Sequence, residues 1–287
     1  MKSVKYFLIG IAIILMIVVL FTRESTDKIT PDIAWASLFV NDLEGYYLDI
    51  NDIRMYYEIH GSGEPILLLH SGFAFIESFY KQIPAFSKHF RVIAPDRRGH
   101  GRSSDSDVGL NYSLLASDMK QLLSYLKIDK VSVVGWRDGG NIGIQMAIEY
   151  PDLVKKLILV GSNFNPAGLT EEIINFAKSD TPNDWDKEAS KWYKRLSPTP
   201  GRWEAFRKKV KEMWLTLPDW TRDDLTQIEI PTMIIVGEND VVKYDHTLTL
   251  HQSIPNSDIY VINEATHFAP IEKPKEFNRK VIGFIKL

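Results

Sequence analysis

The feature that most constrains this chain is residues 130–150, KVSVVGWRDGGNIGIQMAIEY, where an apolar run passes through glycines directly into a second apolar segment. The valines at its start show no polar alternation, which is typical of a strand covered on both faces. From Asn141 onward the apolar residues recur at helical spacing. Gly135 and Gly139 flank Arg137 two residues away on either side. This spacing predicts a tight strand-to-helix turn whose middle residue, Arg137, is strained and points above the sheet.

The residue at the apex of this turn is unsuited to nucleophilic chemistry. Such a turn normally presents Ser, Cys or Asp, because a neighbouring base can activate an oxygen or a sulfur. The guanidinium of Arg137 stays protonated and has no lone pair to donate. A register with Asp138 at the apex is the alternative, but it would place Trp136 where the turn requires a small residue.

Composition excludes several classes of function. The chain has 287 residues, 45% hydrophobic and 25% charged, which is enough for one large domain with a full core and an appendage. A net charge of −3 argues against nucleic acid as a partner. The chain has no cysteine, and its seven histidines form no recognisable ligand pair, so we expect neither a metal nor another cofactor.

The N-terminus carries an uninterrupted apolar run, Tyr6–Phe21, behind Lys2 and Lys5. No small-x-small cleavage signal follows the run closely, which favours an uncleaved membrane anchor over residues 1–22. The lysines would stay in the cytoplasm, so the globular part is expected to be membrane-anchored and extracytoplasmic. The alternatives are a cleaved signal peptide, with a secreted protein, or a buried core helix.

Beyond a linker or arm at residues 23–44, strand-like and helix-like segments alternate over residues 45–287. This alternation predicts an α/β domain with a mostly parallel central sheet and helices on both faces. The continuous run Ile66–Leu69 is expected at the centre of the sheet, and the alternating run Arg54–His60 toward an edge. The pattern also predicts a helix at about Glu77–Ser87.

A long insertion at about residues 162–228 separates two of the predicted parallel strands. It is too long for an ordinary crossover and reads as a helical cap over the carboxyl edge of the sheet. Its aromatic residues either form the core of the cap or contact a ligand. Five of the seven tryptophans of the chain lie in it: Trp185, Trp192, Trp203, Trp214 and Trp220.

Five motifs in order resemble the alpha/beta-hydrolase superfamily: LLLHSG at 67–72, DRRGHGRS at 96–103, VVGWRDGG at 133–140, VGEND at 236–240 and ATHFAPIEKP at 265–274. The resemblance covers residues 45–287 and implies a catalytic order of nucleophile, acid and base at Arg137, Asp240 and His267. Asp240 would hold the imidazole of His267, which would act as general base. The resemblance also implies an oxyanion hole built from the backbone N–H of Asp138 and that of Gly72 or Phe73.

The chain departs from the family pattern at two positions. Arg137 stands where relatives commonly have the nucleophilic Ser, and Ser71 follows His70 where they have Gly. Ser71 and Ser162 are alternative nucleophiles, although neither has a turn to aim it. Charged residues in the second motif, Asp96 and Arg98, are expected either to form a loop-bracing ion pair or to clamp substrate. Asp240 and His267 are alternatively an ordinary surface acid and loop histidine.

These residues leave several functions open. The first is a serine-esterase-like acyl hydrolase whose activity is impaired by Arg137. A second is a non-catalytic protein whose Arg137 holds an anionic ligand under the cap. A third is an enzyme without a covalent step, in which His267 acts directly on water or on an acidic proton. Arg137 could also fold onto Asp240 and fill the site. The expected partners are a small acyl or anionic molecule under the cap and, through the N-terminal segment, a membrane.

Overall fold

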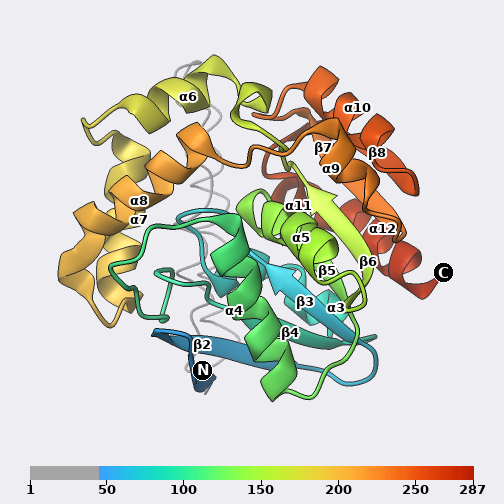
Figure 1. The fold of residues 1–287 in the computed structure, drawn as a ribbon, viewed down its shortest axis with the longest axis horizontal. Helices are drawn as coiled ribbons and strands as arrows, with labels where there is room; N and C mark the ends of the chain where they lie inside the picture. Colours follow the sequence, from blue (N-terminus) through green and yellow to red (C-terminus); the bar gives the residue numbers. More distant parts are fainter. Residues whose placement is uncertain (1–44) are drawn as a thin grey trace, which may run out of the picture. The chain divides into compact units, whose positions relative to one another are not determined.

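A computed structural model describes residues 45–287, which form an eight-stranded sheet flanked by helices (Figure 1). The strand order is β1-β2-β4-β3-β5-β6-β7-β8; β1 and β2 are antiparallel to their neighbours, and the remaining pairs are parallel. The predicted mostly parallel α/β architecture is confirmed. The strands are β1 (Tyr46–Ile50), β2 (Ile53–His60), β3 (Pro65–Leu69), β4 (Arg91–Pro95), β5 (Val131–Trp136), β6 (Val154–Val160), β7 (Thr232–Asn239) and β8 (Ser257–Thr266).

The central strands are buried on both faces, as their continuous apolar runs predict. Along β3, Leu67 and Leu69 belong to one core cluster, whereas Ile66 and Leu68 belong to another on the opposite face. Helices α4 and α5 cover the first face, in front of the sheet in Figure 1, and α12 covers the second. The covering helices are α4 (Tyr112–Tyr125), α5 (Asp138–Glu149), α10 (Tyr244–Ser253) and α12 (Pro274–Lys286).

One predicted helix is wrong. The segment expected to be helical over Glu77–Ser87 consists of a short 3-10 helix, η1 (Ile76–Phe79), and a separate turn, α3 (Ile83–Phe86). Pro84 explains the break, because proline has no backbone N–H and its ring clashes with the carbonyl four residues earlier. Proline is tolerated in the first turn of α3, where it lies.

The insertion between β6 and β7 is helical and packs on the core through its aromatic side chains. Most of its buried apolar residues, among them Trp203, Phe206 and Trp214, belong to the same apolar cluster as α4 and α5, whereas Trp192 packs with Phe75 in a separate cluster. Trp192, Trp203 and Trp214 are thus core residues, and Trp185 and Trp220 are partly buried against the core. The elements are η2 (Pro166–Gly168), α6 (Glu171–Lys178), α7 (Asp184–Leu196), η3 (Pro200–Arg202), α8 (Trp203–Thr216) and α9 (Arg222–Thr226).

The predicted membrane-anchored, extracytoplasmic localisation is contradicted. Within residues 45–287 no helix is both long and apolar enough to cross a membrane. The longest helices there, α4 and α8, have 14 residues each. They extend about 21 Å, short of the roughly 30 Å of a bilayer core. The segments 1–22 and 23–44, on which the predictions of an anchor and a linker rest, lie outside the described residues.

Candidate active site

The turn between β5 and α5 has the strained geometry that its glycines predict. Arg137 has a φ of 53° and a ψ of −112°, which side-chain-bearing residues rarely adopt. A Cβ added to Gly135 would lie 2.3 Å from the carbonyl carbon of Gly139. One added to Gly139 would lie 2.0 Å from the carbonyl oxygen of Leu69. Close packing of backbone against backbone therefore requires glycine at both positions.

The side chain of Arg137 is buried, with 4% of its surface exposed, and its partners are close to the turn. Its Nη1 lies 3.3 Å from Asp138 Oδ1 and 3.2 Å from Asn163 Oδ1. The guanidinium also lies over the indole ring of Trp214, 5.1 Å from the centroid. An ion pair between Arg137 and Asp240, one of the sequence-based alternatives, is absent from residues 45–287.

Asp138 is the acceptor on which this buried cluster converges. Trp214 Nε1 donates to both of its carboxylate oxygens, at 3.0 and 2.9 Å, and the hydroxyl of Tyr112 donates at 3.1 Å. Burial and the charge of Asp138 raise the pKa of Tyr112 well above its usual value, so it remains a phenol that can donate. With Arg137, three donors from three separate segments satisfy one carboxylate, which excludes Asp138 as a free nucleophile at the apex.

Asp240 and His267, the acid and the base that the resemblance implies, lie within hydrogen-bond distance of each other. His267 Nδ1 lies 2.8 Å from Asp240 Oδ1, and the backbone N–H of Val242 donates to the same oxygen at 3.1 Å. Burial acts to raise the pKa of Asp240, but the charge and hydrogen bond of His267 outweigh it, so the pKa is lowered. The carboxylate can thus hold a proton on Nδ1, which leaves Nε2 of His267 as the nitrogen available for chemistry.

Two residues that sequence reasoning missed position this pair. Gly161, at the end of β6, has a φ of 53°, and a Cβ there would lie 2.7 Å from His267 Nδ1 and 2.9 Å from Asp240 Oδ2. Trp136 Nε1 donates to the carbonyl oxygen of His267 at 3.1 Å. The position of Gly161 at the carboxyl end of a central parallel strand was the available signal, because sites of such sheets lie at that edge.

The loop after β3 carries the predicted oxyanion donors and lies against the turn. A Cβ added to Gly72 would lie 2.4 Å from Asp138 Oδ2. Asp138 begins α5, so its own N–H has no partner within the helix. Phe73 has a φ of 56°, which is unusual for an aromatic residue. Its ring packs against four rings of the insertion, with centroids 5.1 Å (Trp185), 5.4 Å (Trp203), 5.9 Å (Phe206) and 5.2 Å (Trp214) away.

Neither alternative serine is aimed at His267. Ser162 is buried, and its hydroxyl donates to the carbonyl oxygen of Arg137 at 3.3 Å. Ser71 contributes its carbonyl oxygen, which accepts from Arg97 Nη2 at 2.9 Å. Among residues 45–287, the hydrogen-bond partner of the His267 ring is Asp240.

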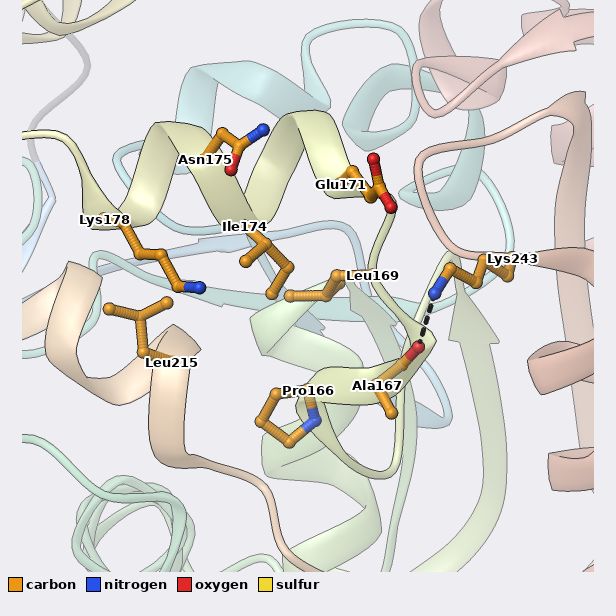
Figure 2. A pocket seen from close by; sticks show the side chains of 9 residues that line it. All are labelled: Pro166, Ala167, Leu169, Glu171, Ile174, Asn175, Lys178, Leu215 and Lys243. Carbon is orange, nitrogen blue, oxygen red and sulfur yellow. Dashed lines mark hydrogen bonds between the residues drawn. The ribbon is translucent and has the colours of Figure 1, made fainter.

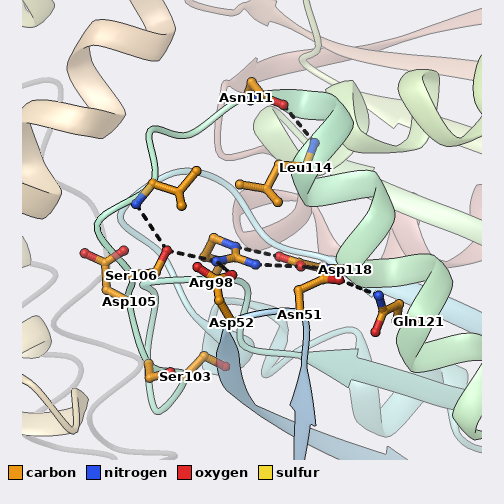
Figure 3. A network of polar contacts seen from close by, with 12 residues as sticks. Asn51, Asp52, Arg98, Ser103, Asp105, Ser106, Asn111, Leu114, Asp118 and Gln121 are labelled. Atoms are coloured by element: carbon orange, nitrogen blue, oxygen red, sulfur yellow. Dashed lines mark hydrogen bonds and ion pairs between the residues drawn. The ribbon is translucent and has the colours of Figure 1, made fainter.

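The expected pair of Asp96 and Arg98 does not form, and each residue has other partners. Arg98 is fully buried and donates to both carboxylate oxygens of Asp118 at 2.8 Å, and to Asp52 at 2.5 Å (Figure 3). Asp96 instead pairs with Arg102 at 3.1 Å and accepts from the N–H of Ile76 at 2.9 Å. Both arginines brace the loop against distant segments, so a substrate clamp at Arg98 is not supported.

His246, in the first turn of α10, packs against the start of the insertion. The His246 ring stacks on Phe164, with centroids 3.9 Å apart and planes 9° apart, and its Nε2 accepts from the Phe164 N–H at 3.1 Å. A Cβ on Gly168 would lie 2.3 Å from this ring. Burial, aided by the charge of Lys243, lowers the pKa of His246 to about 4. The imidazole is therefore neutral at pH 7, as its acceptor role requires.

A surface cavity of about 450 Å³ opens between α6 and the segment after β7 (Figure 2). Apolar side chains lie between Lys178 at one end and Lys243 at the other, and Lys243 Nζ donates to the carbonyl oxygen of Ala167 at 3.0 Å. Arg137, Asp240 and His267 are not among its lining residues, and His267 is only 8% exposed. The cavity is lined by Pro166, Ala167, Leu169, Glu171, Ile174, Asn175, Lys178, Leu215 and Lys243.

Comparison with known proteins gives consistent matches. A family model described as alpha/beta hydrolase fold matches residues 64–197. A 2-hydroxy-6-oxononadienedioate/2-hydroxy-6-oxononatrienedioate hydrolase of Paraburkholderia phymatum is 30% identical, over 91% of this chain and 99% of that protein. The human serine hydrolase BPHL is 26% identical, over 88% of this chain and 89% of that protein. A solved meta-cleavage product hydrolase of Pseudomonas fluorescens has a TM-score of 0.71 at 23% identity, covering 82% of this chain and 94% of that one.

Proposed function

Because this chain belongs to the alpha/beta-hydrolase superfamily, we propose that it is an acyl-hydrolase scaffold whose general base is intact and whose covalent step is blocked by Arg137. In this proposal Asp240 orients His267, and His267 Nε2 faces a site from which the nucleophilic hydroxyl is missing. Gly72, or its neighbour Phe73, and Asp138 supply the oxyanion donors. The ligand is a small acyl compound bound under the insertion.

The placement of the Arg137 guanidinium is the observation that carries this proposal. It is turned to Asp138 and Asn163, while the Asp240–His267 pair keeps a hydrogen bond of 2.8 Å. The charge of Arg137 is already balanced by Asp138, which argues against an anionic ligand bound by Arg137 alone. An arginine cannot form an acyl-enzyme, since its guanidinium has no lone pair to attack a carbonyl carbon.

The relatives point to the chemistry of the ligand. Several are named as hydrolases of 2-hydroxy-6-oxo dienoates, and two are named as serine hydrolases. All of these names describe hydrolases, and the dienoate names also specify an oxo group in the substrate. We therefore extend the proposal to compounds with a reactive carbonyl carbon, esters and oxo acids included.

Replacing Arg137 with serine tests the proposal. The native chain should not react with a serine-directed phosphonate, whereas Arg137→Ser should react with it and hydrolyse short-chain esters. Loss of a triad nucleophile costs on the order of 10⁶ in turnover, so the gain is bounded by that factor. The substitution also removes the ionic partner of the buried Asp138. The gain will be smaller if this unpaired charge, or water in the space left by the guanidinium, disturbs the turn.

His267→Ala in both backgrounds is the control for this experiment. It should abolish the labelling and the ester hydrolysis of Arg137→Ser without unfolding the chain. Phosphonate labelling of the native chain that depends on His267 would reveal another nucleophile and refute the blocked covalent step. A folded Arg137→Ser variant that stays silent would refute the intact scaffold.

A second function is favoured by the hydrogen bond between His267 and Asp240. Such a pair can activate water directly, without a covalent intermediate. Slow ester hydrolysis by the native chain should then be lost in His267→Ala and be unaffected by the phosphonate. Absence of any hydrolysis that depends on His267 in the native chain would exclude this alternative.

A further inference from the structure

The carbonyl oxygen of Ser71, in the loop after β3, accepts hydrogen bonds from three donors. His70 Nδ1 lies 2.8 Å away, Arg97 Nη2 lies 2.9 Å away, and the N–H of Ala74 closes a turn at 3.3 Å. The DRRGHGRS motif thus reaches the loop that carries Gly72 through its own second residue, Arg97. A carbonyl with three donors is fixed in direction.

The tautomer of His70 follows from its two contacts. The backbone N–H of Arg97 donates to His70 Nε2 at 3.1 Å, so Nε2 carries no proton. Burial and the charge of Arg97 lower the pKa of His70 well below its usual value, which keeps the ring neutral. The remaining proton lies on Nδ1 and is donated to the Ser71 carbonyl. Arg97 therefore holds this carbonyl twice, directly through Nη2 and indirectly through His70.

A carbonyl fixed in this way also fixes the next amide. The Ser71–Gly72 peptide is trans, and in a planar trans peptide the C=O and N–H point in opposite directions. The Gly72 N–H thus points away from Arg97 and His70, and it donates to no acceptor within residues 45–287. Gly72 itself lies against the turn, since a Cβ built on it would lie 2.4 Å from Asp138 Oδ2. We propose that Arg97, acting through the Ser71 carbonyl, is the positioning residue that aims the Gly72 N–H into the oxyanion hole.

The cost of burying Arg97 supports a specific task for it. The side chain is 0% exposed, and its Nε and Nη1 have no hydrogen-bond partner among the described residues. Burial lowers the pKa of Arg97, and the charge of Asp138 only partly offsets this. Asp138 accepts its hydrogen bonds from Tyr112, Arg137 and Trp214 instead. An apolar side chain of similar length would avoid this cost but could not hold the carbonyl.

The inference rests on the proposed function, because an aimed N–H matters only for a site that acts on a carbonyl group. In the Arg137→Ser background, Arg97→Met should lower kcat on the order of 10- to 100-fold with little change in KM. Outright removal of an oxyanion donor costs roughly 100- to 1000-fold, and a misaimed donor should cost less. Arg97→Lys should restore part of the lost kcat, since an ammonium can also donate to the Ser71 carbonyl.

Arg207→Met is the matched control, because Arg207 is a buried arginine of α8 whose bonds go to Glu204 and the carbonyl of Asp180. It should lower stability and leave kcat unchanged. An equal fall in kcat for both variants, or a rise in KM alone for Arg97→Met, would overturn the inference.

A second measurement does not depend on activity. The sequence contains two serine–glycine pairs, Ser62–Gly63 and Ser71–Gly72. Full-length protein labelled with carbonyl-¹³C serine and ¹⁵N glycine should therefore give two cross-peaks in a carbonyl–amide correlation spectrum. Arg97→Met in the otherwise native chain should shift the Ser71–Gly72 peak in both carbonyl and nitrogen dimensions and leave the Ser62–Gly63 peak in place.

The two measurements separate the inference from the proposed function. A folded but inactive Arg137→Ser variant refutes the proposed function. A shifted Ser71–Gly72 peak would even then support the inference that Arg97 positions this peptide. An unmoved Ser71–Gly72 peak in Arg97→Met overturns the inference, whatever the activity of Arg137→Ser. Should Arg97→Met fail to fold, Arg97→Lys provides the spectrum, with a smaller shift expected at the same peak.

Discussion

Arg137 shows that a turn of the kind that usually presents a nucleophile can instead hold a positively charged residue without a lone pair. The backbone conformation is imposed by the packing of Gly135 and Gly139, which does not depend on the side chain between them. The guanidinium is buried, but the adjacent Asp138 balances its charge and the side-chain oxygen of Asn163 accepts a hydrogen bond from it. A local ion pair of this kind limits the penalty of burying a charge. The turn therefore persists although its chemistry has changed.

At the same scale, Gly161→Ala should displace His267 from Asp240. The new methyl group would lie 2.7 Å from His267 Nδ1, and alanine would also be strained at a φ of 53°. The downfield proton resonance of the Nδ1–H bond should weaken or vanish, and in the Arg137→Ser background hydrolysis should fall at least tenfold, since about 1.4 kcal/mol of misplacement suffices for that.

Gly283→Ala serves as the control for this substitution. Gly283 lies in α12 with no atom near a built Cβ, so alanine there should raise stability by roughly 0.5–1 kcal/mol. A Gly161→Ala variant with an unchanged Nδ1–H resonance would contradict the close contact.

Among the elements, α8 connects the insertion most directly to the turn. It carries Trp214, which donates to Asp138, lies under the guanidinium of Arg137 and packs on Phe73. On its other side, Lys209 Nζ lies 2.5 Å from Asp105, in the loop that follows the DRRGHGRS motif. Because one helix binds both neighbours of the site, a movement of α8 would change the turn and the loop together.

Trp214→Phe should destabilise the chain, because it keeps a ring against Phe73 but leaves a buried carboxylate with one donor fewer. The expected loss in the free energy of unfolding is about 1–3 kcal/mol, measured by denaturant titration. Trp220→Phe is the matched control, since Trp220 is only partly buried and donates to Gln145 at 3.2 Å. An equal loss of stability in both variants would show that the hydrogen bond from Trp214 to Asp138 contributes no more to stability than the bond from Trp220 to Gln145.

The contact of His246 with Phe164, at the start of the insertion, should make the stability of the chain sensitive to acid. Its pKa is near 6.5 in the unfolded chain and about 4 in the folded one. Between these values the unfolded chain binds more protons, so the free energy of unfolding falls as the pH drops from 6.5 to 4. The full difference between the two pKa values corresponds to about 3.4 kcal/mol, and the loss is smaller than this because the ring is partly exposed to solvent.

His246→Phe isolates this component, since phenylalanine keeps the stack on Phe164 and does not titrate. Unfolding curves recorded at several pH values should show that the native chain loses more stability than the variant across this window. Parallel pH profiles for the two proteins would contradict the buried neutral imidazole.

For the molecule as a whole, the insertion is expected to be necessary for a well-formed core. Its buried aromatic residues share a cluster with α4 and α5 and cover Phe73. Replacing residues 162–228 with a short Gly/Ser linker should abolish a single cooperative unfolding transition, as followed by circular dichroism. The same linker placed after the exposed Pro182, with nothing removed, should leave the transition nearly unchanged. A truncated chain as stable as the intact one would contradict this expectation.

The sequence predicted features that depend on local pattern and missed those that depend on distant partners. The sheet, the turn and the order of its motifs follow from periodicity and glycine spacing over short windows. The helix expected over Glu77–Ser87 was wrong because one proline outweighed the apolar pattern. The direction of the Arg137 side chain is set by Asn163 and Trp214, far along the chain, and no local pattern encodes it. The roles of Asp240 and His267 stay predictions, although their side chains lie within hydrogen-bond distance.

The ring cluster around Phe73 also gives the protein a built-in optical reporter. Trp185 and Trp214 lie 6.1 Å apart with planes inclined by 32°, close enough for their electronic transitions to couple. Such coupling produces near-ultraviolet circular dichroism that depends steeply on distance and angle. A ligand that displaced either ring on entering beneath the insertion would change this signal, so binding could be followed without an attached chromophore.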